Sequence, residues 1–237
     1  SSVIAPDGTP LKGDQASRIL DLAGIVVNRN TIPGDSSALN PSGIRLGTGW
    51  ISQRGFTVSD SIYLADLIAD LLQACQPFYY RGQRNLKQFR ARVDFDVFNR
   101  IKCAVHTLAQ SKGIDFVPAQ HGYPHFYYAD QPTPVGDYHQ IEISGSRAAA
   151  FLQPILSNDV LTLTEGQAQA TSLRINNDDD WVAGVLQQHS TGYTLTVPAD
   201  KSVRVITWLR DLADGYVLLD STDQHAKAAG PVVVQDG

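Results

Sequence analysis

The sequence predicts an α+β (α/β) fold made of two domains in series, and three observations support this. Of the 237 residues, 43% are hydrophobic and 18% are charged, as in a globular chain rather than a disordered one. Helical periodicity dominates the first half, whereas short strand-like runs dominate the second. A stretch rich in proline and aromatic residues separates them. We therefore predict domains at residues 1–113 and 138–237, joined by a linker at 114–137.

The first domain is expected to open with a helix, a strand and a long loop. Apolar residues recur at helical spacing over 15–23, and Gly24 stands where a helix would end. The β-branched run Ile25-Val26-Val27 predicts a strand. The residues that follow are rich in Gly, Ser, Asn, Thr and Pro, which indicates a long ordered loop or several tight turns.

Two longer helices complete the first domain. Thr57 and Asp60 have the spacing of a capping box, with Asp in the place usually held by Glu or Gln. Apolar residues then recur every three or four positions over 64–75, which predicts a helix. A second helix is predicted over 98–108, with Gly113 as its stop signal.

The second domain is expected to alternate strands and helices. In chain order the pattern predicts a strand at 140–144, a helix over 149–156, strands at 168–175, 181–188 and 193–197, a helix over 203–212 and a closing strand at 216–219. This order is typical of a split β-α-β, ferredoxin-like layer.

Composition excludes several classes of function. The net charge of −5 and the pI of about 5.6 give no overall attraction to nucleic acid or to an anionic membrane. No apolar run approaches the roughly 18 residues of a membrane span. Cys75 and Cys103 fall in apolar helical patterns, which indicates buried thiols in a reducing cytosol. We expect a cytoplasmic protein without nucleic-acid or membrane partners.

The chain contains no methionine, even at its first position. Removal of an initiator residue, cleavage of a tag and excision from a longer protein would each explain this. The motifs below favour excision, so we expect the chain to be a piece of a larger protein.

Three short blocks in the first domain carry unusual chemistry: 27–33 (VNRNTIP), 42–48 (SGIRLGT) and 54–56 (RGF). Glycines flank Arg45 in the middle block, which would let the backbone approach a ligand while the guanidinium points at it. An arginine held in this way suits bidentate recognition of a small carboxylate. The spacing is equally consistent with a buried arginine that bridges loop carbonyl groups.

These blocks resemble the small-domain signature of serine hydroxymethyltransferases, roughly V-N-K-N-x-x-P, S-G-I-R-x-G-T and R-G-F, over about residues 8–112. The resemblance implies the small domain of a fold-type I pyridoxal phosphate enzyme. It also implies that Arg45 binds the substrate carboxylate beside Ser42 and Gly43, and that Asn30 lies near folate. Serine, glycine, pyridoxal phosphate and tetrahydrofolate would be the substrates and cofactors of the parent protein.

Two departures from that family limit what the isolated chain is expected to do. Gly49-Trp50 stand where the family usually has Pro-Ala, and Trp50 would bring a bulky ring close to the ligand pocket. The large domain with the cofactor-binding lysine is missing, and no T-x-x-H-K stretch occurs. We therefore expect no catalytic residue and no bound cofactor in this chain alone, an upstream pyridoxal phosphate-binding domain as partner, and a possible homodimer.

A second resemblance covers about residues 138–220. The segment 141–160 is similar to the opening of the aminomethyltransferase (glycine-cleavage T-protein) family, although half of the match is ordinary hydrophobic pattern. A folate-independent look-alike domain therefore stays open. The family's paired aspartates align with Ala183-Gly184, so we do not expect that reaction here. The acidic run at 178–180 is interpreted as a solvated turn.

Two further clusters favour structural interpretations. His121 and His125 have a spacing that could ligate a metal on a helix, but Gly122 and Pro124 disfavour a helix there. We expect interface packing and no metal site. A basic cluster at 81–92 has aromatic residues interleaved. It could bind phosphate or RNA, although a solvated or domain-docking surface is favoured.

Two functional hypotheses follow. The first is a fragment of a hydroxymethyltransferase–aminomethyltransferase fusion that contributes Arg45 and folate-side loops to a site completed upstream. The alternative is a non-catalytic binding or scaffolding protein that keeps both folds. The intact block 42–48 favours the first hypothesis, whereas Trp50 and Ala183-Gly184 favour the alternative.

Overall fold

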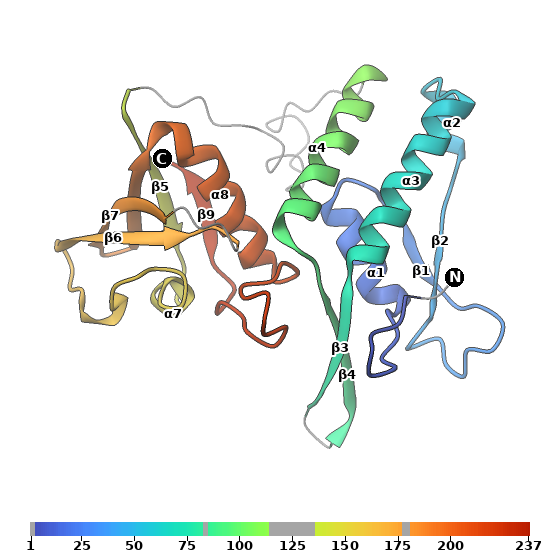
Figure 1. Cartoon of the computed structure of the whole chain (residues 1–237), viewed down its shortest axis with the longest axis horizontal. Helices are drawn as coiled ribbons and strands as arrows, with labels where there is room; N and C mark the ends of the chain where they lie inside the picture. The colour runs from blue at the N-terminus through green and yellow to red at the C-terminus, as the bar shows by residue number, and fades with distance from the viewer. Residues whose placement is uncertain (1–2, 83–84, 114–135, 177–180) are drawn as a thin grey trace. The chain divides into compact units, whose positions relative to one another are not determined.

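A computed structural model describes residues 3–82, 85–113, 136–176 and 181–237. The chain divides into two compact units, Ser1–Ala129 and Asp130–Gly237, and each is described by itself (Figure 1). The linker predicted at 114–137 lies almost entirely outside the described residues.

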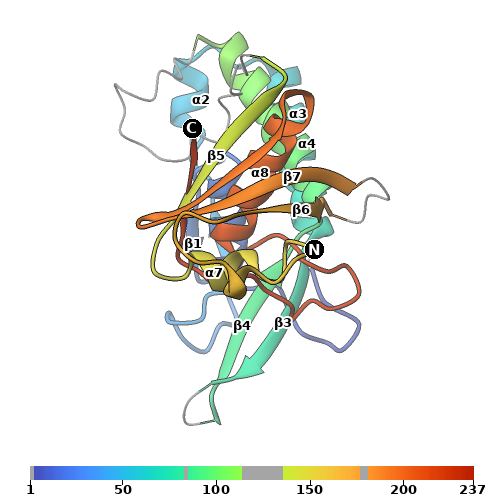
Figure 2. The ribbon, with the colours of Figure 1, turned by 90° about the vertical axis from the view of Figure 1, so that its left-hand side faces the viewer.

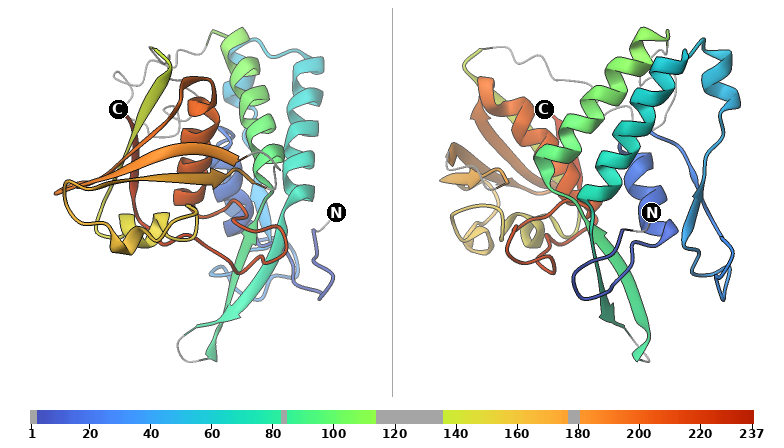
Figure 3. Two further views of the ribbon diagram at one scale, coloured as in Figure 1. Left: turned by 60° about the vertical axis from the view of Figure 1, so that its left-hand side comes forward. Right: turned by 45° about the vertical axis from the view of Figure 1, so that its right-hand side comes forward.

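The first unit contains four helices and four strands among its described residues. They are α1 (Gly13–Leu22), β1 (Asn28–Asn30), β2 (Gly43–Arg45), α2 (Gly49–Gln53), α3 (Val58–Ala74), β3 (Gln76–Arg81), β4 (Lys87–Arg92) and α4 (Phe95–Ser111). Strands β1 and β2 form one antiparallel ribbon, and β3 and β4 form another. Helices α3 and α4 lie side by side, and the β3–β4 hairpin extends from the end they share (Figures 1 and 3).

The two long helices form where their capping and apolar residues predict them. Thr57 accepts a hydrogen bond from the Asp60 backbone, and the Asp60 carboxylate accepts one in return, so the predicted capping box is confirmed. Asp94 caps α4 through the N–H groups of residues 96 and 97. The core of the unit consists of fully or almost fully buried apolar side chains: Ile19, Leu20, Leu67, Leu71, Phe95, Phe98 and Ile101.

Two predictions for the first unit were wrong, and one of its elements was not predicted. Ile25-Val26-Val27 do not form a strand, because Ile25 folds back under α1, where its N–H donates to the Leu20 carbonyl at 2.8 Å. Only Ile25 of the run is buried, Val26 is exposed, and the strand begins only at Asn28. The β3–β4 hairpin was not predicted as a structural element. Cys103 is exposed, whereas Cys75 is buried and burial raises its pKa to about 12.

The second unit is a five-stranded antiparallel sheet with one long helix. Its elements are β5 (Tyr138–Ser144), α7 (Ala148–Leu152), the 3₁₀ turn η2 (Val160–Thr162), β6 (Ala168–Arg174), β7 (Trp181–His189), β8 (Gly192–Pro198), α8 (Ala199–Asp214) and β9 (Val233–Asp236). The strand order is β6-β7-β8-β5-β9. Both β8 and β9 run antiparallel to β5, so they are parallel to each other and α8 joins them across it (Figure 2). This is a split β-α-β unit, with β6 as an added edge strand.

Two elements of the second unit differ from the predictions. Helix α7 has only five residues, since the chain turns after Leu152 and Leu156 pairs with Leu173 of β6 instead. Residues 216–219 form no extended strand, and the closing strand is β9. Val217 and Leu218 are apolar because they are buried, and burial alone does not distinguish a strand from a loop.

One face of the sheet forms the core of the second unit with α8. Alternate residues Ile141 and Ile143 of β5 and Leu195 of β8 are fully buried, as is Trp208 on α8. Gly215 ends α8 in the left-handed conformation with φ of 80°. Among the described residues, no helix is long and apolar enough to cross a bilayer.

Candidate functional site

The β1–β2 ribbon brings the first two motif blocks together. Its register pairs Asn28 with Arg45 and Asn30 with Gly43, so residues about fifteen positions apart in sequence lie directly opposite each other (Figure 3). Ser42 immediately precedes β2. The proposed carboxylate and folate residues therefore lie on one short ribbon.

Close packing against α1 explains two glycines of this region. Gly13, the first residue of α1, is buried, and its N–H donates to the Pro41 carbonyl at 2.9 Å. A side-chain carbon at Gly13 would overlap the carbonyl oxygen of Gly43. A side-chain carbon at Gly43 would in turn collide with Ile32. The absence of side chains here lets the helix and the ribbon touch backbone to backbone.

Asp35 closes the loop between the two strands. Its carboxylate accepts hydrogen bonds from the N–H of Ile32 at 3.0 Å and from the N–H of Ser42 at 2.9 Å. Lys12 donates to the Ser42 hydroxyl at 3.1 Å, and its ammonium also lies 5.5 Å from the centre of the Phe89 ring. Both ends of the loop are thus held in position beside β2.

An ion pair fixes β1 to α1. Arg29 approaches Asp14 at 2.9 Å, and both side chains are partly exposed. Pairs of this kind contribute little stability by themselves, about 0–1 kcal/mol. Together with the contact between Gly13 and Gly43, this ion pair positions the ribbon on α1.

Arg45 is exposed at the end of β2. It is therefore not a buried arginine that bridges loop carbonyls. Within the described part of the chain, its guanidinium makes no hydrogen bond or ion pair. Five N–H donors on a planar group without such partners suit a carboxylate supplied from outside.

The third block follows the end of α2 and lies near the residue that follows α4. The Phe56 N–H donates to the Ile51 carbonyl at 3.1 Å, and Gly55 adopts φ of 71°. The Lys112 ammonium lies 5.6 Å from the centre of the Phe56 ring. Trp50 on the same helix is 74% exposed, so it is not packed into the first unit.

The residues of this chain do not by themselves fit pyridoxal phosphate, which needs a lysine in an enclosed site. Lys201 and Lys227 are exposed. The other lysines have contacts within the first unit: Lys12 with Ser42 and Phe89, Lys87 with Tyr79, Lys102 with Phe98, and Lys112 with Asp60 and Phe56. A cofactor lysine would have to come from another domain.

The other residues considered from the sequence, in the second domain and the linker, add less to a functional site. A carbon added at Gly184 would approach the Thr196 carbonyl oxygen at 2.7 Å, so the position cannot accept an aspartate without a shift of the sheet. Residues 178–180, His121 and His125 lie outside the described residues. The described ranges contain no group of three or more His, Cys, Asp or Glu residues that could hold a metal ion.

The basic cluster forms the β3–β4 hairpin. Arg90 donates to the Tyr80 hydroxyl at 3.1 Å, and Lys87 lies 4.1 Å from the centre of the Tyr79 ring. Arg81 donates to Asn85 in the turn. Arg84 lies outside the described residues. The aromatic side chains thus hold basic ones along the hairpin, which agrees with a solvated or docking surface as well as with phosphate binding.

Acid is expected to weaken the first unit through Asp35 and Asp60. Hydrogen bonds from Ser42 and Ile32 lower the pKa of Asp35 from 3.8 to about 2, and those from Lys112 and Thr57 lower the pKa of Asp60 to about 2. Because both carboxyl groups have a lower pKa in the folded chain than in the unfolded chain, their ionised forms stabilise the fold above about pH 4. This stabilisation is lost as the pH falls from about 4 to about 2.

Urea unfolding of the first unit between pH 2 and 7 measures this effect. Asp60→Asn should lower stability at neutral pH and flatten the acid limb, with Asp66→Asn on the same helix as control. Parallel acid limbs in wild type and Asp60→Asn would contradict the assignment.

The segment that contains this ribbon matches a known protein family. Residues 3–68 match the family model described as serine hydroxymethyltransferase. The match contains α1, the β1–β2 ribbon, α2 and the first part of α3. It therefore includes all three motif blocks, while the β3–β4 hairpin and α4 lie beyond it.

Several curated proteins named serine hydroxymethyltransferase are similar to the same region. The protein of Caenorhabditis briggsae is 43% identical over 81 residues, which is 34% of this chain and 16% of that protein. The protein of Wigglesworthia glossinidia brevipalpis is 52% identical over 66 residues, 27% of this chain and 15% of its own length. The protein of Natronomonas pharaonis is 48% identical over 61 residues, which is 25% of this chain and 14% of that protein. The chain thus spans a small part of the relatives it matches.

The sequence pattern identified the motif blocks, but neither the ribbon that they form nor the residues that hold it. Lys12, Asp35 and Gly13 position Ser42 and β2, yet none of them was a candidate. A Pro-Gly-Asp turn at 33–35 was the one available signal, since Asp after Gly in a turn often bonds nearby N–H groups. The contact of Gly13 with Gly43 has no local signature.

Proposed function

We propose that this chain supplies the amino-acid carboxylate-binding segment of a serine hydroxymethyltransferase-like site that another domain completes. The observation that carries this proposal is Arg45, exposed on β2 and without an intramolecular partner among the described residues, within a segment that matches that family. Arg45 would bind the carboxylate of serine or glycine. Ser42 and Gly43 would shape the adjoining backbone.

Asn30 is proposed to lie beside tetrahydrofolate. It is exposed at the end of β1 opposite Gly43, and its amide donates to the Thr31 carbonyl at 2.9 Å. This leaves the amide oxygen as an acceptor for a ligand. Pyridoxal phosphate, bound by the completing domain, would withdraw electrons from the α-carbon of the amino acid. The proposed role of this chain is to hold and orient the substrate.

The exposed apolar surface of the first unit supports the proposal that another domain packs against it. Large apolar side chains are exposed along the ribbon, its loops and the start of α3: Val26, Ile32, Leu39, Leu46, Trp50, Val58, Ile62 and Tyr63. An exposed apolar surface of this kind is typical of a protein interface. We propose that the pyridoxal phosphate-binding domain, and a second copy if the protein dimerises, cover it. Trp50 would then be an interface residue.

Reconstitution tests the proposal. The chain is expressed alone and together with the remainder of a related serine hydroxymethyltransferase, and the conversion of serine to glycine with tetrahydrofolate is measured. The pair is expected to form a complex and to turn over serine, whereas neither part alone should do so. A pair that forms a complex but releases no glycine would overturn the enzymatic proposal.

The second candidate is a non-catalytic binding or scaffolding protein. The second unit favours it, because Gly184 has no room for the aspartate that the aminomethyltransferase reaction would need. We propose that this unit is related to aminomethyltransferases by fold without their reaction. Complex formation without turnover in the reconstitution would support this candidate.

A further inference from the structure

The β3–β4 hairpin is a basic and aromatic element that the proposed function does not use. It lies beyond residues 3–68, the part of the chain that matches the family model. Its two strands contain four aromatic residues, four basic residues and no acidic residue. They are Phe78, Tyr79, Tyr80 and Phe89, and Arg81, Lys87, Arg90 and Arg92. In a chain with a net charge of −5, the hairpin is therefore a local concentration of positive charge.

One face of the hairpin combines aromatic rings with cations. Tyr79 lies opposite Phe89, and Arg81 lies opposite Lys87 on the same face, further along the strands. The ring centres of Tyr79 and Phe89 are 6.5 Å apart, and the Lys87 ammonium lies 4.1 Å from the centre of the Tyr79 ring. The Lys12 ammonium lies 5.5 Å from the centre of the Phe89 ring. Basic and aromatic groups therefore lie next to one another along this face.

The other face presents an exposed tyrosine beside an arginine. Tyr80 is 42% exposed, so its ring is accessible to a ligand in solution. Arg90 donates to the Tyr80 hydroxyl at 3.1 Å and to the Phe89 carbonyl at 2.7 Å. These bonds hold the guanidinium beside the ring and leave further N–H groups of Arg90 for an anion.

The positive charges of the hairpin are not paired with carboxylates. In the described part of the chain, Arg81, Lys87 and Arg90 form no ion pair. Hydrogen bonds from Thr9 lower the pKa of Asp7, and Lys87 contributes to this at longer range. Arg81 and Lys87 are like charges directly opposite each other, an arrangement that destabilises a hairpin. An anion bound by both side chains would remove this repulsion.

We propose that the hairpin binds single-stranded nucleic acid without reading its sequence. Sites of this kind combine basic side chains, which bind the phosphates, with aromatic rings on which bases stack. Arg81, Lys87 and Arg90 would bind phosphates, and Tyr80 would stack on a base. An acidic peptide would also neutralise the cations, but a nucleic acid carries a flat base beside every phosphate. The net charge of the chain, from which no nucleic-acid partner was expected, is an average that hides this local charge.

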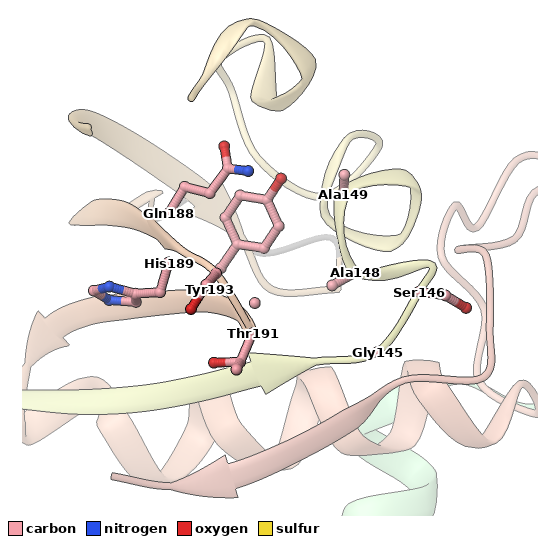
Figure 4. Close-up of a pocket in the computed structure, with 10 residues that line it drawn as sticks. Gly145, Ser146, Ala148, Ala149, Gln188, His189, Thr191 and Tyr193 are labelled. Carbon is pink, nitrogen blue, oxygen red and sulfur yellow. The ribbon is translucent and has the colours of Figure 1, made fainter. Parts of the chain in front are cut away.

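A hollow of about 440 Å³ in the second unit lacks these features. The turn that leads from β5 into α7 and the β7–β8 hairpin line it (Figure 4). The described residues of its lining include no Lys, Arg, Asp or Glu, and His189 points away from it. The hollow therefore offers a polyanion no comparable charge, and exposed residues of the second unit can serve as controls for the hairpin.

Fluorescence anisotropy with a labelled oligouridylate of about twelve nucleotides tests the proposal on the full chain. The affinity is expected to fall as the salt concentration rises, because phosphate contacts release counterions. Arg81→Gln/Lys87→Gln should make the slope of log K against log salt shallower by about 1.4, roughly 0.7 for each lost phosphate contact. Lys201→Gln/Lys227→Gln removes the same charge from exposed positions of the second unit and should leave the slope unchanged.

Tyr80→Leu tests the stacking contact. It should weaken oligouridylate binding about fivefold or more without a change in the salt slope, because the loss of one stacked base lowers the affinity by about that factor. Tyr138→Leu is the matched control, since Tyr138 is 68% exposed in the second unit, and it should bind as wild type does.

Several outcomes would overturn the proposal. They are no binding of oligouridylate at low salt, equally effective displacement by polyphosphate or oligoglutamate of the same charge, or unchanged affinity in Tyr80→Leu. Circular dichroism establishes that each variant is folded. If Arg81→Gln/Lys87→Gln does not fold, Tyr80→Leu and the displacement experiment decide the question alone. Failure here would leave the reconstitution assay of serine turnover unaffected, so the two proposals fail separately.

Discussion

Replacing Gly13 with alanine is expected to destabilise the first unit by about 1–3 kcal/mol, the usual cost of overpacking. The added carbon would overlap the Gly43 carbonyl oxygen and lie 3.1 Å from the Pro41 oxygen. Both are backbone atoms that cannot rotate away. Alanine favours a helix over glycine by roughly 1 kcal/mol, but the collision outweighs this gain because α1 and β2 must separate to relieve it. Urea unfolding followed by circular dichroism measures the change.

Gly47→Ala is the matched control. Position 47 lies two residues after Arg45, and a carbon added there meets no atom within 4 Å in the described chain. Stability should therefore change by less than about 0.5 kcal/mol. Equal stability of Gly13→Ala and Gly47→Ala would show that the helix–ribbon contact does not hold β2. If Gly47 instead serves close approach to another domain, Gly47→Ala would impair complex formation while leaving the isolated chain intact.

Arg45→Lys is expected to weaken glycine binding by the reconstituted pair roughly 30- to 1000-fold. Lysine keeps the charge but lacks the planar fork, so it loses a bidentate bond worth about 2–4 kcal/mol to a carboxylate. Since Arg45 is exposed on β2, the substitution should not alter the fold. Equilibrium dialysis of labelled glycine measures the affinity directly.

Arg18→Lys on α1 is the control for charge and expression. Arg18 is 61% exposed and forms a weak ion pair with Asp14, so glycine affinity should not change. An Arg45→Lys pair that binds glycine as tightly as wild type would contradict the carboxylate assignment, provided that both proteins form the complex to the same extent.

The sequence pattern predicted the parts of the fold that depend on local signals. The capping box at Thr57 and Asp60 and the repeat of apolar residues along α3 each arise from neighbouring residues. The strands of the second unit were predicted for the same reason, except the last. Its final strand, β9, follows a long irregular segment and pairs with β5 at the other end of the domain, so no local pattern identifies it.

The candidate site likewise has parts that local sequence signals predict and parts that they do not. Three conspicuous blocks located Arg45, Ser42 and Asn30, but pattern alone could not decide whether the arginine was buried or exposed. The position of β2 involves the close contact of Gly13 with Gly43, which lies thirty positions later in the sequence.

The central claim is that this chain holds the carboxylate-binding arginine of a site whose cofactor lies in another domain. The most direct measurement is the visible absorbance of pyridoxal phosphate during a glycine titration, recorded for the chain alone and for the reconstituted pair. We predict no retained cofactor absorbance for the chain alone, and for the pair a glycine-dependent change that Arg45→Lys abolishes. Cofactor absorbance retained by the isolated chain, or a glycine response in the pair that persists in Arg45→Lys, would contradict the claim.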